Sequence, residues 1–180
     1  MRRPLAAAAV LALAAAGWYL GSPLFLTSRV DEALPGGPPI ALPSGRPAPA
    51  GATPGATPAP AGAVESAASA VLVLASGKLG FVDDLHHGEG AVRLVEVAGQ
   101  RILRFEGVTI TNAPDVRIYL SKDAGGRYVA SNAVELGALK ATSGSFNYDV
   151  PAGVDLAAHR NVIVWCRAFN VLITWADLAG

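Results

Sequence analysis

The sequence predicts an all-β protein: an antiparallel β-sandwich or barrel-like domain, preceded by an N-terminal transmembrane helix and a disordered Pro/Gly/Ala-rich linker. From residue 70 onward, short apolar runs alternate with turn residues, and no window has the pattern of a long amphipathic helix. An uncharged apolar stretch lies near the N-terminus, and nine of the 13 prolines lie between Pro35 and Pro60. These observations divide the chain into residues 1–27, 28–69 and 70–180.

The first part has the features of a signal anchor. Arg2 and Arg3 precede an apolar, uncharged stretch that ends at Leu26. From Leu5 onward this stretch would form a helix about 33 Å long at 1.5 Å per residue, which is enough to cross a bilayer core. The leading arginines favour a cytoplasmic N-terminus, so we expect a single-pass protein of the cell membrane with its C-terminal domain on the extracytoplasmic side. The side chains expected to meet membrane lipid include Leu5, Leu11, Leu13, Trp18, Tyr19 and Leu20.

A cleavable signal peptide is the alternative for the same segment. Ala14–Ala16 supplies small residues of the kind that signal peptidases require. Apolar character continues past them, through Trp18–Leu20 and again through Leu24–Leu26, and this argues against cleavage. Trp and Tyr rings also suit the boundary between membrane and water. The sequence therefore favours an uncleaved anchor and leaves open whether the segment is ever cut.

The second part, with its core from about Leu34 to Ser66, has the composition of a linker. Proline removes backbone donors and glycine adds conformational entropy, so a segment this rich in both cannot build a packed core. The Gly51–Pro58 stretch is a low-complexity repeat rather than a structural one. A semi-rigid tether of about 30 residues at ~3.1 Å each would reach roughly 90 Å, so we expect a spacer between membrane and domain.

The third part contains the predicted strands. Arg93–Val97 and Arg101–Phe105 alternate between apolar and polar residues, as half-buried strands do, and Ala98–Gln100 between them predicts a hairpin turn. Val154–His159 has room for one helical turn. The expected strands are Val71–Ala75, Ala91–Val97, Arg101–Glu106, Arg117–Ser121, Ala133–Leu139, Ser145–Val150, Asn161–Phe169 and Val171–Trp175.

Composition excludes several classes of function. The 14 basic and 14 acidic side chains cancel, so the chain lacks the positive charge that nucleic-acid binding requires. One cysteine cannot form an internal disulfide, and the single methionine, Met1, leaves no thioether ligand for copper or haem iron. The sequence has no Gly-x-Ser-x-Gly elbow, no His-Glu-x-x-His motif and no phosphate-binding glycine loop, so it does not predict an ordinary hydrolase. These exclusions do not favour a classical enzyme.

Cys166 is the first candidate functional residue. It ends the most apolar predicted strand and shares a face of that strand with Val162 and Val164. One interpretation is a buried free thiol that packs as a small hydrophobic side chain. The other follows from the expected location, because an unpaired thiol outside the cytoplasm must be shielded, paired with another chain, or used in redox or metal chemistry.

The densest group of potential metal ligands runs from Asp83 to Glu89 and includes His86 and His87. Adjacent side chains on an extended chain point to opposite sides, so both imidazoles would seldom bind one ion. The sequence favours a polar loop with one hydrogen-bonded histidine over a metal site in which His86 or His87 is a ligand. We expect His159 to be a solvated loop residue.

Several motifs of the third part, taken in order and spacing, resemble the DM13 domain family. They cover nearly all of residues 79–178 and comprise Gly80–Phe81, His86–Gly90, Val108–Ser121, Phe146–Pro151 and Val162–Phe169. The segments Trp18–Phe25 and Val30–Ala33 are similar to the membrane anchor of bacterial members. Ala113 departs from the family pattern, which usually has glycine before Pro-Asp, although alanine is acceptable where φ is negative.

The resemblance implies a β-sandwich-like domain with a proposed electron-transfer role. By this resemblance Cys166 would be redox-active or would ligate haem, and the family's histidine would be His86 or His87, with Trp165 and Tyr119 near the site. The leading hypothesis is thus a membrane-tethered redox module that uses Cys166 with haem or with no cofactor and exchanges electrons with a partner protein. The competing hypothesis is a cell-envelope binding or adhesion module with a structural, buried cysteine.

Overall fold

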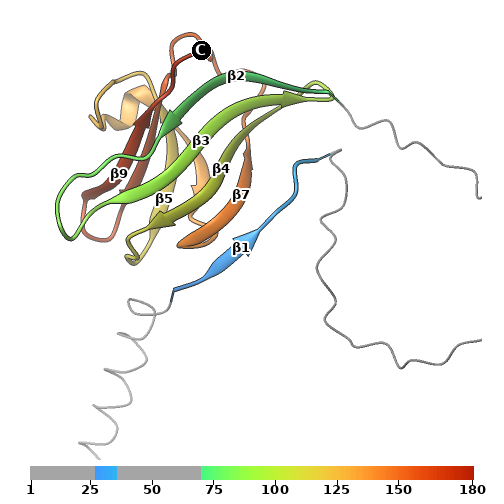
Figure 1. Cartoon of the computed structure of the whole chain (residues 1–180). Coiled ribbons are helices and arrows are strands. Elements are labelled where there is room, and N and C mark those ends of the chain that lie inside the picture. Colours follow the sequence, from blue (N-terminus) through green and yellow to red (C-terminus); the bar gives the residue numbers. More distant parts are fainter. Residues whose placement is uncertain (1–26, 36–69) are drawn as a thin grey trace, which may run out of the picture.

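The computed structural model describes residues 27–35 and 70–180, which form two β-sheets packed face to face (Figure 1). The first sheet has the strand order β1-β7-β4-β3-β2 and the second has the order β6-β5-β8-β9. Its elements are β1 (Arg29–Asp31), β2 (Val71–Lys78), β3 (Gly88–Val97), β4 (Gln100–Ile110), β5 (Val116–Ser121), the 3-10 helix η1 (Ala130–Asn132), β6 (Ala133–Ala138), β7 (Ser143–Asp149), β8 (Asn161–Cys166) and β9 (Val171–Asp177). The all-β prediction is confirmed for this part of the chain.

The predicted membrane span and nearly all of the predicted linker lie outside the described residues. Within residues 27–35 and 70–180, no helix has the length and hydropathy that a membrane crossing requires.

The main core lies between the two sheets. Phe105 and Phe146 on the first sheet are fully buried, with ring centroids 5.1 Å apart, and Tyr148 packs edge-on against both rings. The second sheet supplies the facing layer, which includes Ile118 and Val164. β4 and β7 show the alternation of buried and less buried residues that two packed sheets require, whereas β5 and β8 are buried along almost their whole length.

The turn residues confirm the predicted hairpin between β3 and β4 and correct the predicted end of β8. Ala98 and Gly99 have φ of 50° and 78°, as the tight hairpin predicted between β3 and β4 requires. The last predicted strand before β9 was too long, because β8 ends at Cys166 and residues 167–170 turn back into β9. Asn170 has a φ of 55°, which an extended strand cannot accommodate, and Phe169 is 64% exposed.

β1 is a strand that the sequence placed in the connecting segment 28–69. It pairs in parallel with β7 and forms one edge of the first sheet, where Ser143 N donates to Ser28 O (3.0 Å) and Glu32 N donates to Ser145 O (2.7 Å). All the other strand pairs are antiparallel. A short segment before the predicted linker therefore belongs to the same sheet as the residues that follow it, as the blue arrow in Figure 1 shows.

Candidate functional site

Three connections meet at one end of the sandwich: residues 81–87 between β2 and β3, 111–115 between β4 and β5, and 167–170 between β8 and β9. Thr111 N donates to His87 O (3.1 Å), which joins the first connection to the second. Arg167 N donates to Asp115 O (3.1 Å), which joins the second to the third. We call this the loop end. The opposite end carries the hairpin at residues 97–100 and the segment 150–153, and we call it the hairpin end (Figure 1).

Cys166 lies directly beneath the second connection. Its side chain has no exposed surface, and Sγ donates a hydrogen bond to the carbonyl oxygen of Pro114 (2.9 Å). It packs in the main core with Val162 and Val164, as the predicted strand face requires. Pro114 is only partly buried and Asp115 is exposed, so one layer of backbone separates the thiol from solvent.

An ionic network closes over this layer. Asp115 accepts hydrogen bonds from the Nε atoms of Arg117 (2.7 Å) and Arg167 (2.9 Å). Glu135 lies 3.2 Å from Arg117 Nη1 and 3.7 Å from Arg167 Nη1. The hydrogen bonds from Arg117 and then Arg167 hold the pKa of Asp115 below its usual value, so its carboxylate stays charged at neutral pH. These partners hold the 111–115 connection against β5 and β8.

The turn over Cys166 explains the departure at Ala113. Among the described non-glycine residues, positive φ occurs only at Ala98, Asp115 and Asn170. Alanine therefore meets no backbone strain at position 113, and the left-handed residue of this turn is Asp115, with a φ of 51°. Short polar side chains such as aspartate tolerate this conformation better than most, and the two arginines hold it in place.

The two histidines of the loop make separate contacts. His86 Nδ1 lies 2.9 Å from both carboxylate oxygens of Asp83, and this hydrogen bond is the main cause that lowers the pKa of Asp83. His87 Nδ1 lies 3.5 Å from Thr111 Oγ1, and its ring stacks with Phe81 at a centroid distance of 6.1 Å. Within the described residues, no three His, Cys, Asp or Glu side chains are grouped so that they could hold a metal ion.

Trp165 belongs to an aromatic stack on the outer face of the second sheet. Its ring lies 4.5 Å from that of Tyr128, which lies 5.0 Å from Tyr119. Burial is the main cause that raises the pKa of Tyr119, so its hydroxyl stays protonated and lies 3.4 Å from the Glu135 carboxylate. Trp165 and Cys166 are neighbours on β8 and point to opposite faces of the sheet, so they cannot line one cavity.

Tyr128 is a residue that the sequence analysis missed. It lies in the long connection between β5 and β6, and neither alternation nor a motif marks it. The same connection packs Gly126 against Trp175, where an added Cβ would lie 2.6 Å from the indole ring. The one feature of the sequence that could have pointed to Tyr128 is that it is an aromatic residue within an otherwise largely polar turn region.

His159 corrects an expectation. It was predicted to be a solvated loop residue, but it is 7% exposed, and its Nδ1 lies 2.8 Å from the carbonyl oxygen of Asp155. The segment 151–159 folds back on itself through a turn at Asp155, whose carboxylate accepts a hydrogen bond from Ala157 N (2.9 Å). This compact turn buries the imidazole against the domain.

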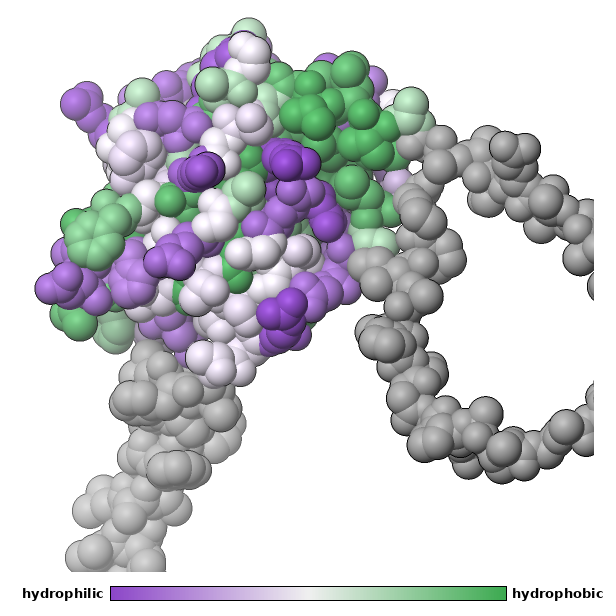
Figure 2. All heavy atoms as spheres, in the orientation of Figure 1, coloured by the Kyte–Doolittle hydropathy of each residue, from purple (hydrophilic) through white to green (hydrophobic). Residues whose placement is uncertain are grey.

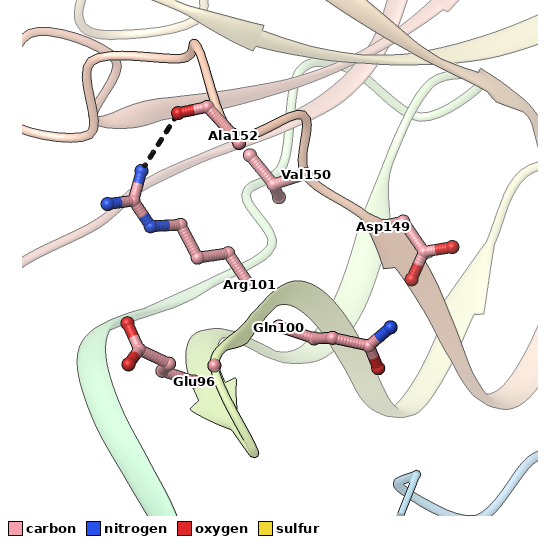
Figure 3. Close-up of a pocket in the computed structure, with 7 residues that line it drawn as sticks. Glu96, Gln100, Arg101, Asp149, Val150 and Ala152 are labelled. Atoms are coloured by element: carbon pink, nitrogen blue, oxygen red, sulfur yellow. Dashed lines mark hydrogen bonds between the residues drawn. The ribbon is translucent and has the colours of Figure 1, made fainter.

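An open pocket of about 560 Å³ lies at the hairpin end, far along the strands from Cys166. Figure 3 shows Glu96 and Arg101 on one side of it and Gln100 and Asp149 on the other. Arg101 Nη1 donates to the carbonyl oxygen of Ala152 at 3.5 Å. The pocket is polar and contains none of the predicted site residues, so its size alone does not make it the site.

Haem ligation through Cys166 does not fit this arrangement. A porphyrin ring needs an open face beside the axial sulfur, whereas Sγ here has no exposed surface and is hydrogen-bonded to Pro114. Trp165 points away from it, and the histidine loop is separated from it by the 111–115 connection. The residues around Sγ are therefore suited to a thiol without a cofactor.

Comparison with known protein families assigns residues 80–178 to one family. The model of the family described as Electron transfer DM13 matches residues 80–178, which is more than half of the chain and includes the loop end, Cys166 and the aromatic stack. No curated protein and no solved structure matches the chain.

Proposed function

Because this chain belongs to the DM13 family of electron-transfer domains, we propose that it is a membrane-tethered extracytoplasmic electron-transfer module whose redox group is the Cys166 thiol. The observation that carries the choice of Cys166 is its position. Sγ is the only thiol of the chain and lies one backbone layer below the surface, under a connection held by exposed ionic contacts. Exposed ion pairs contribute little stability and open readily, so a partner can reach the thiol without unfolding the core.

The redox step involves one electron and one proton. When the 111–115 connection opens, the thiol gives one electron to an oxidising carrier protein and its proton to water, which leaves a thiyl radical on Sγ. A reducing carrier then returns one electron while Sγ takes up a proton, and the thiol is restored. The Trp165–Tyr128–Tyr119 stack lies on the opposite, outer face of the same sheet and takes no part in this step.

The tether in this proposal is the apolar stretch from Leu5 to Leu26, with the basic residues before it in the cytoplasm. A membrane location suits a module with a single redox group, because its partners are then confined to the same surface. Haem is not part of the proposal, and a colourless protein is the expected result.

A binding module is the second candidate, and the complete burial of Cys166 favours it. Under this alternative the thiol is a small apolar side chain of the core. The open polar pocket at the hairpin end would then hold the ligand, with Arg101, Glu96 and Asp149 as its charged groups (Figure 3).

Thiol chemistry on the full chain separates the two candidates. The rate at which a thiol reagent modifies Cys166 is measured in the native protein at low denaturant concentrations. A rate that does not change with denaturant reports a local opening, as the electron-transfer proposal expects, whereas a rate that follows global unfolding favours the binding module. A one-electron oxidant in the presence of a spin trap should give a thiyl adduct that Cys166→Ser abolishes, and an absent adduct overturns the role of Cys166.

A further inference from the structure

Large apolar side chains are exposed on the connections at the loop end. Phe81 is 66% exposed, Leu85 is 74% exposed and Phe169 is 64% exposed. The first two belong to residues 81–87 and the third to residues 167–170, and both connections adjoin the one that covers Cys166. In Figure 2 apolar atoms reach the surface at the left of the domain, where Figure 1 places these connections, and they are separate from the larger apolar patch at the upper right.

The exposure of Phe81 and Leu85 is built into a tight turn. One carboxylate oxygen of Asp83 accepts hydrogen bonds from Leu85 N (2.8 Å) and His86 N (2.7 Å), and Val82 N donates to His86 O (3.1 Å). These bonds satisfy the polar groups of the turn internally, so the apolar side chains are directed outward. Their position is therefore suited to an apolar environment outside the protein.

The amino end of β1 lies at this same end of the sandwich. Ser28 N donates to Thr142 Oγ1 (3.0 Å), and Ser28 lines a pocket of about 200 Å³ together with Ala113 and Asp115 from the connection over Cys166. Since β1 runs parallel to β7, the chain before residue 28 leaves the sheet here and not at the hairpin end.

Side-chain contacts hold β1 in this position in addition to its backbone pairing with β7. Glu32 lies 2.9 Å from Lys140 Nζ and accepts a hydrogen bond from Asn147 N (2.9 Å). Arg104 Nη1 donates to the carbonyl oxygen of Glu32 (3.1 Å). Gly144 has a φ of 108°, and any Cβ there would collide with the carbonyl group of Val30. The sequence of β7 thus leaves space for the backbone of β1.

This geometry brings the predicted membrane span close to the domain. Only Thr27 separates Leu26, the end of the apolar stretch, from Ser28, so the gap is about 7 Å even when the chain is fully extended. The linker 36–69 follows β1 and joins it to β2, the other edge of the same sheet, roughly 20 Å away across four strand spacings. If residues 5–26 span the membrane, the chain reaches β1 before it reaches residues 36–69, so in the proposal below β1, and not the predicted spacer, adjoins the membrane anchor.

We propose that the domain rests with its loop end against the lipid bilayer surface, where Phe81, Leu85 and Phe169 insert at the level of the lipid headgroups. This inference deepens the proposed function and rests on its membrane anchor. Apolar and aromatic side chains are stable in the interfacial layer, and the anchor holds them at high effective concentration beside it. The covered thiol then faces the membrane, so the electron partner is a carrier bound to or dissolved in that membrane.

The loop end carries charges of both signs, so the contact needs no anionic lipid. Arg29 and Arg167 are exposed there, as are Asp83 and Asp115. The other exposed apolar patch, Val71–Val73 on β2, lies at the hairpin end and faces away from the bilayer in this orientation. It supplies a control, since Leu72 is 59% exposed and has the same side chain as Leu85.

The experiment uses the full chain in vesicles of zwitterionic phosphatidylcholine that contain a spin-labelled quenching lipid. A cysteine introduced by Leu85→Cys carries an environment-sensitive fluorophore, and Leu72→Cys is the matched control; both variants also carry Cys166→Ser, so that only the introduced thiol is labelled. Quenching several-fold stronger at position 85 than at position 72 is expected. Equal quenching, or none at position 85 in vesicle-bound protein, overturns the inference. Failure of the unlabelled protein to float with vesicles after a carbonate wash would instead reject the anchor of the proposed function.

Two insertions of equal length sharpen the same test. A 12-residue Gly/Ser insertion between Thr27 and Ser28 should remove most of the quenching at position 85, because it places slack between the membrane and β1. The same insertion after Gly51 should leave the quenching unchanged, because that linker only connects two edges of one sheet. The opposite result would mean that β1 does not hold the domain at the membrane.

Discussion

The two ends of the sandwich are built differently, although the same strands connect them. At the hairpin end, β3 and β4 are joined by a two-residue turn, and the open pocket is lined by polar side chains. At the loop end, three longer connections are tied together by backbone hydrogen bonds and ion pairs above a buried thiol. The pocket at the hairpin end, of about 560 Å³, is larger than the one of about 200 Å³ beside the 111–115 connection, whereas the thiol of Cys166 lies at the loop end. The larger pocket and the thiol thus lie at opposite ends of this domain.

The ends also differ in how tightly they are packed. At the loop end, a Cβ added to Gly88 would lie 2.6 Å from Thr174 Cγ2, and Thr174 Oγ1 donates to the carbonyl oxygen of Gly80 (2.6 Å). At the hairpin end, a Cβ added to Gly153 would meet nothing within 4 Å. Gly88 at the loop end is therefore packed tightly against the Thr174 side chain, whereas Gly153 at the hairpin end has open space around it.

Substitution of glycine should give the largest difference between the ends. Gly88→Val is expected to lower the free energy of unfolding by about 3 kcal/mol, because the side chain displaces Thr174 from a filled position. Gly153→Ala should leave stability unchanged or raise it by about 0.5 kcal/mol through the unfolded state. Denaturant unfolding of both variants measures the difference, and similar stabilities would show that the two ends are equally tolerant.

Removal of the thiol should have a smaller effect. Cys166→Ala is expected to lower the free energy of unfolding by about 1–3 kcal/mol, the usual range for truncation of a core side chain. Cys166→Ser keeps a donor for the carbonyl oxygen of Pro114 and serves as the matched variant. Thermal and denaturant unfolding provide the measurement, and an unchanged melting temperature in Cys166→Ala would contradict the burial of this residue.

Loosening the cover of Cys166 should change reactivity and leave global stability almost unchanged. In Arg167→Gln the 111–115 connection loses one of the two arginines that hold Asp115. The native thiol should then react several-fold faster with a thiol reagent, and added salt should have a similar effect on the unmodified protein. Arg101→Gln at the hairpin end is the control and should leave the rate unchanged. An equal rise in both variants would mean that the thiol is exposed by a general loosening.

A fall in pH should loosen β1 from the edge of the sheet, and this is the smallest of the expected effects on the stability of the domain. Burial raises the pKa of Glu32, but the hydrogen bonds from Lys140 and Asn147 N outweigh it and lower the pKa overall. A lowered pKa means that the ionised carboxylate stabilises the docked strand above its ordinary pKa of about 4.3 and that this contribution is lost as the pH falls below it. Amide exchange of residues 30–33 should accelerate in that range, and Glu32→Gln should show no such pH dependence.

Sequence reasoning predicted the elements whose determinants are local. The hairpin at Ala98–Gly99 follows from its own turn residues, and the inward face of Cys166 follows from alternation along β8. β1 could not be predicted, because a three-residue strand has no periodicity and its pairing depends on β7, more than 100 residues later. Tyr128 was missed for the same reason, since its stacking depends on partners from β5 and β8.

Phe169 shows why an apolar run can mislead. The apolar residues around it predicted one strand through residue 169, but the chain turns at residues 167–170 and leaves the ring in solvent. Hydropathy along the sequence does not distinguish an apolar side chain that is buried in the protein core from one that contacts an apolar environment outside the protein, such as lipid. The proposed contact with lipid accounts for such a residue at the tip of a turn.

The parallel pairing of β1 with β7 has a consequence for biosynthesis. β1 leaves the ribosome early, but its partner strand is made more than 100 residues later, so this is among the contacts of highest sequence separation in the domain. The rest of the sheet can assemble through hairpins of neighbouring strands while the edge of β7 is still vacant. We therefore expect β1 to dock late in folding, after the hairpins of the sheet have formed.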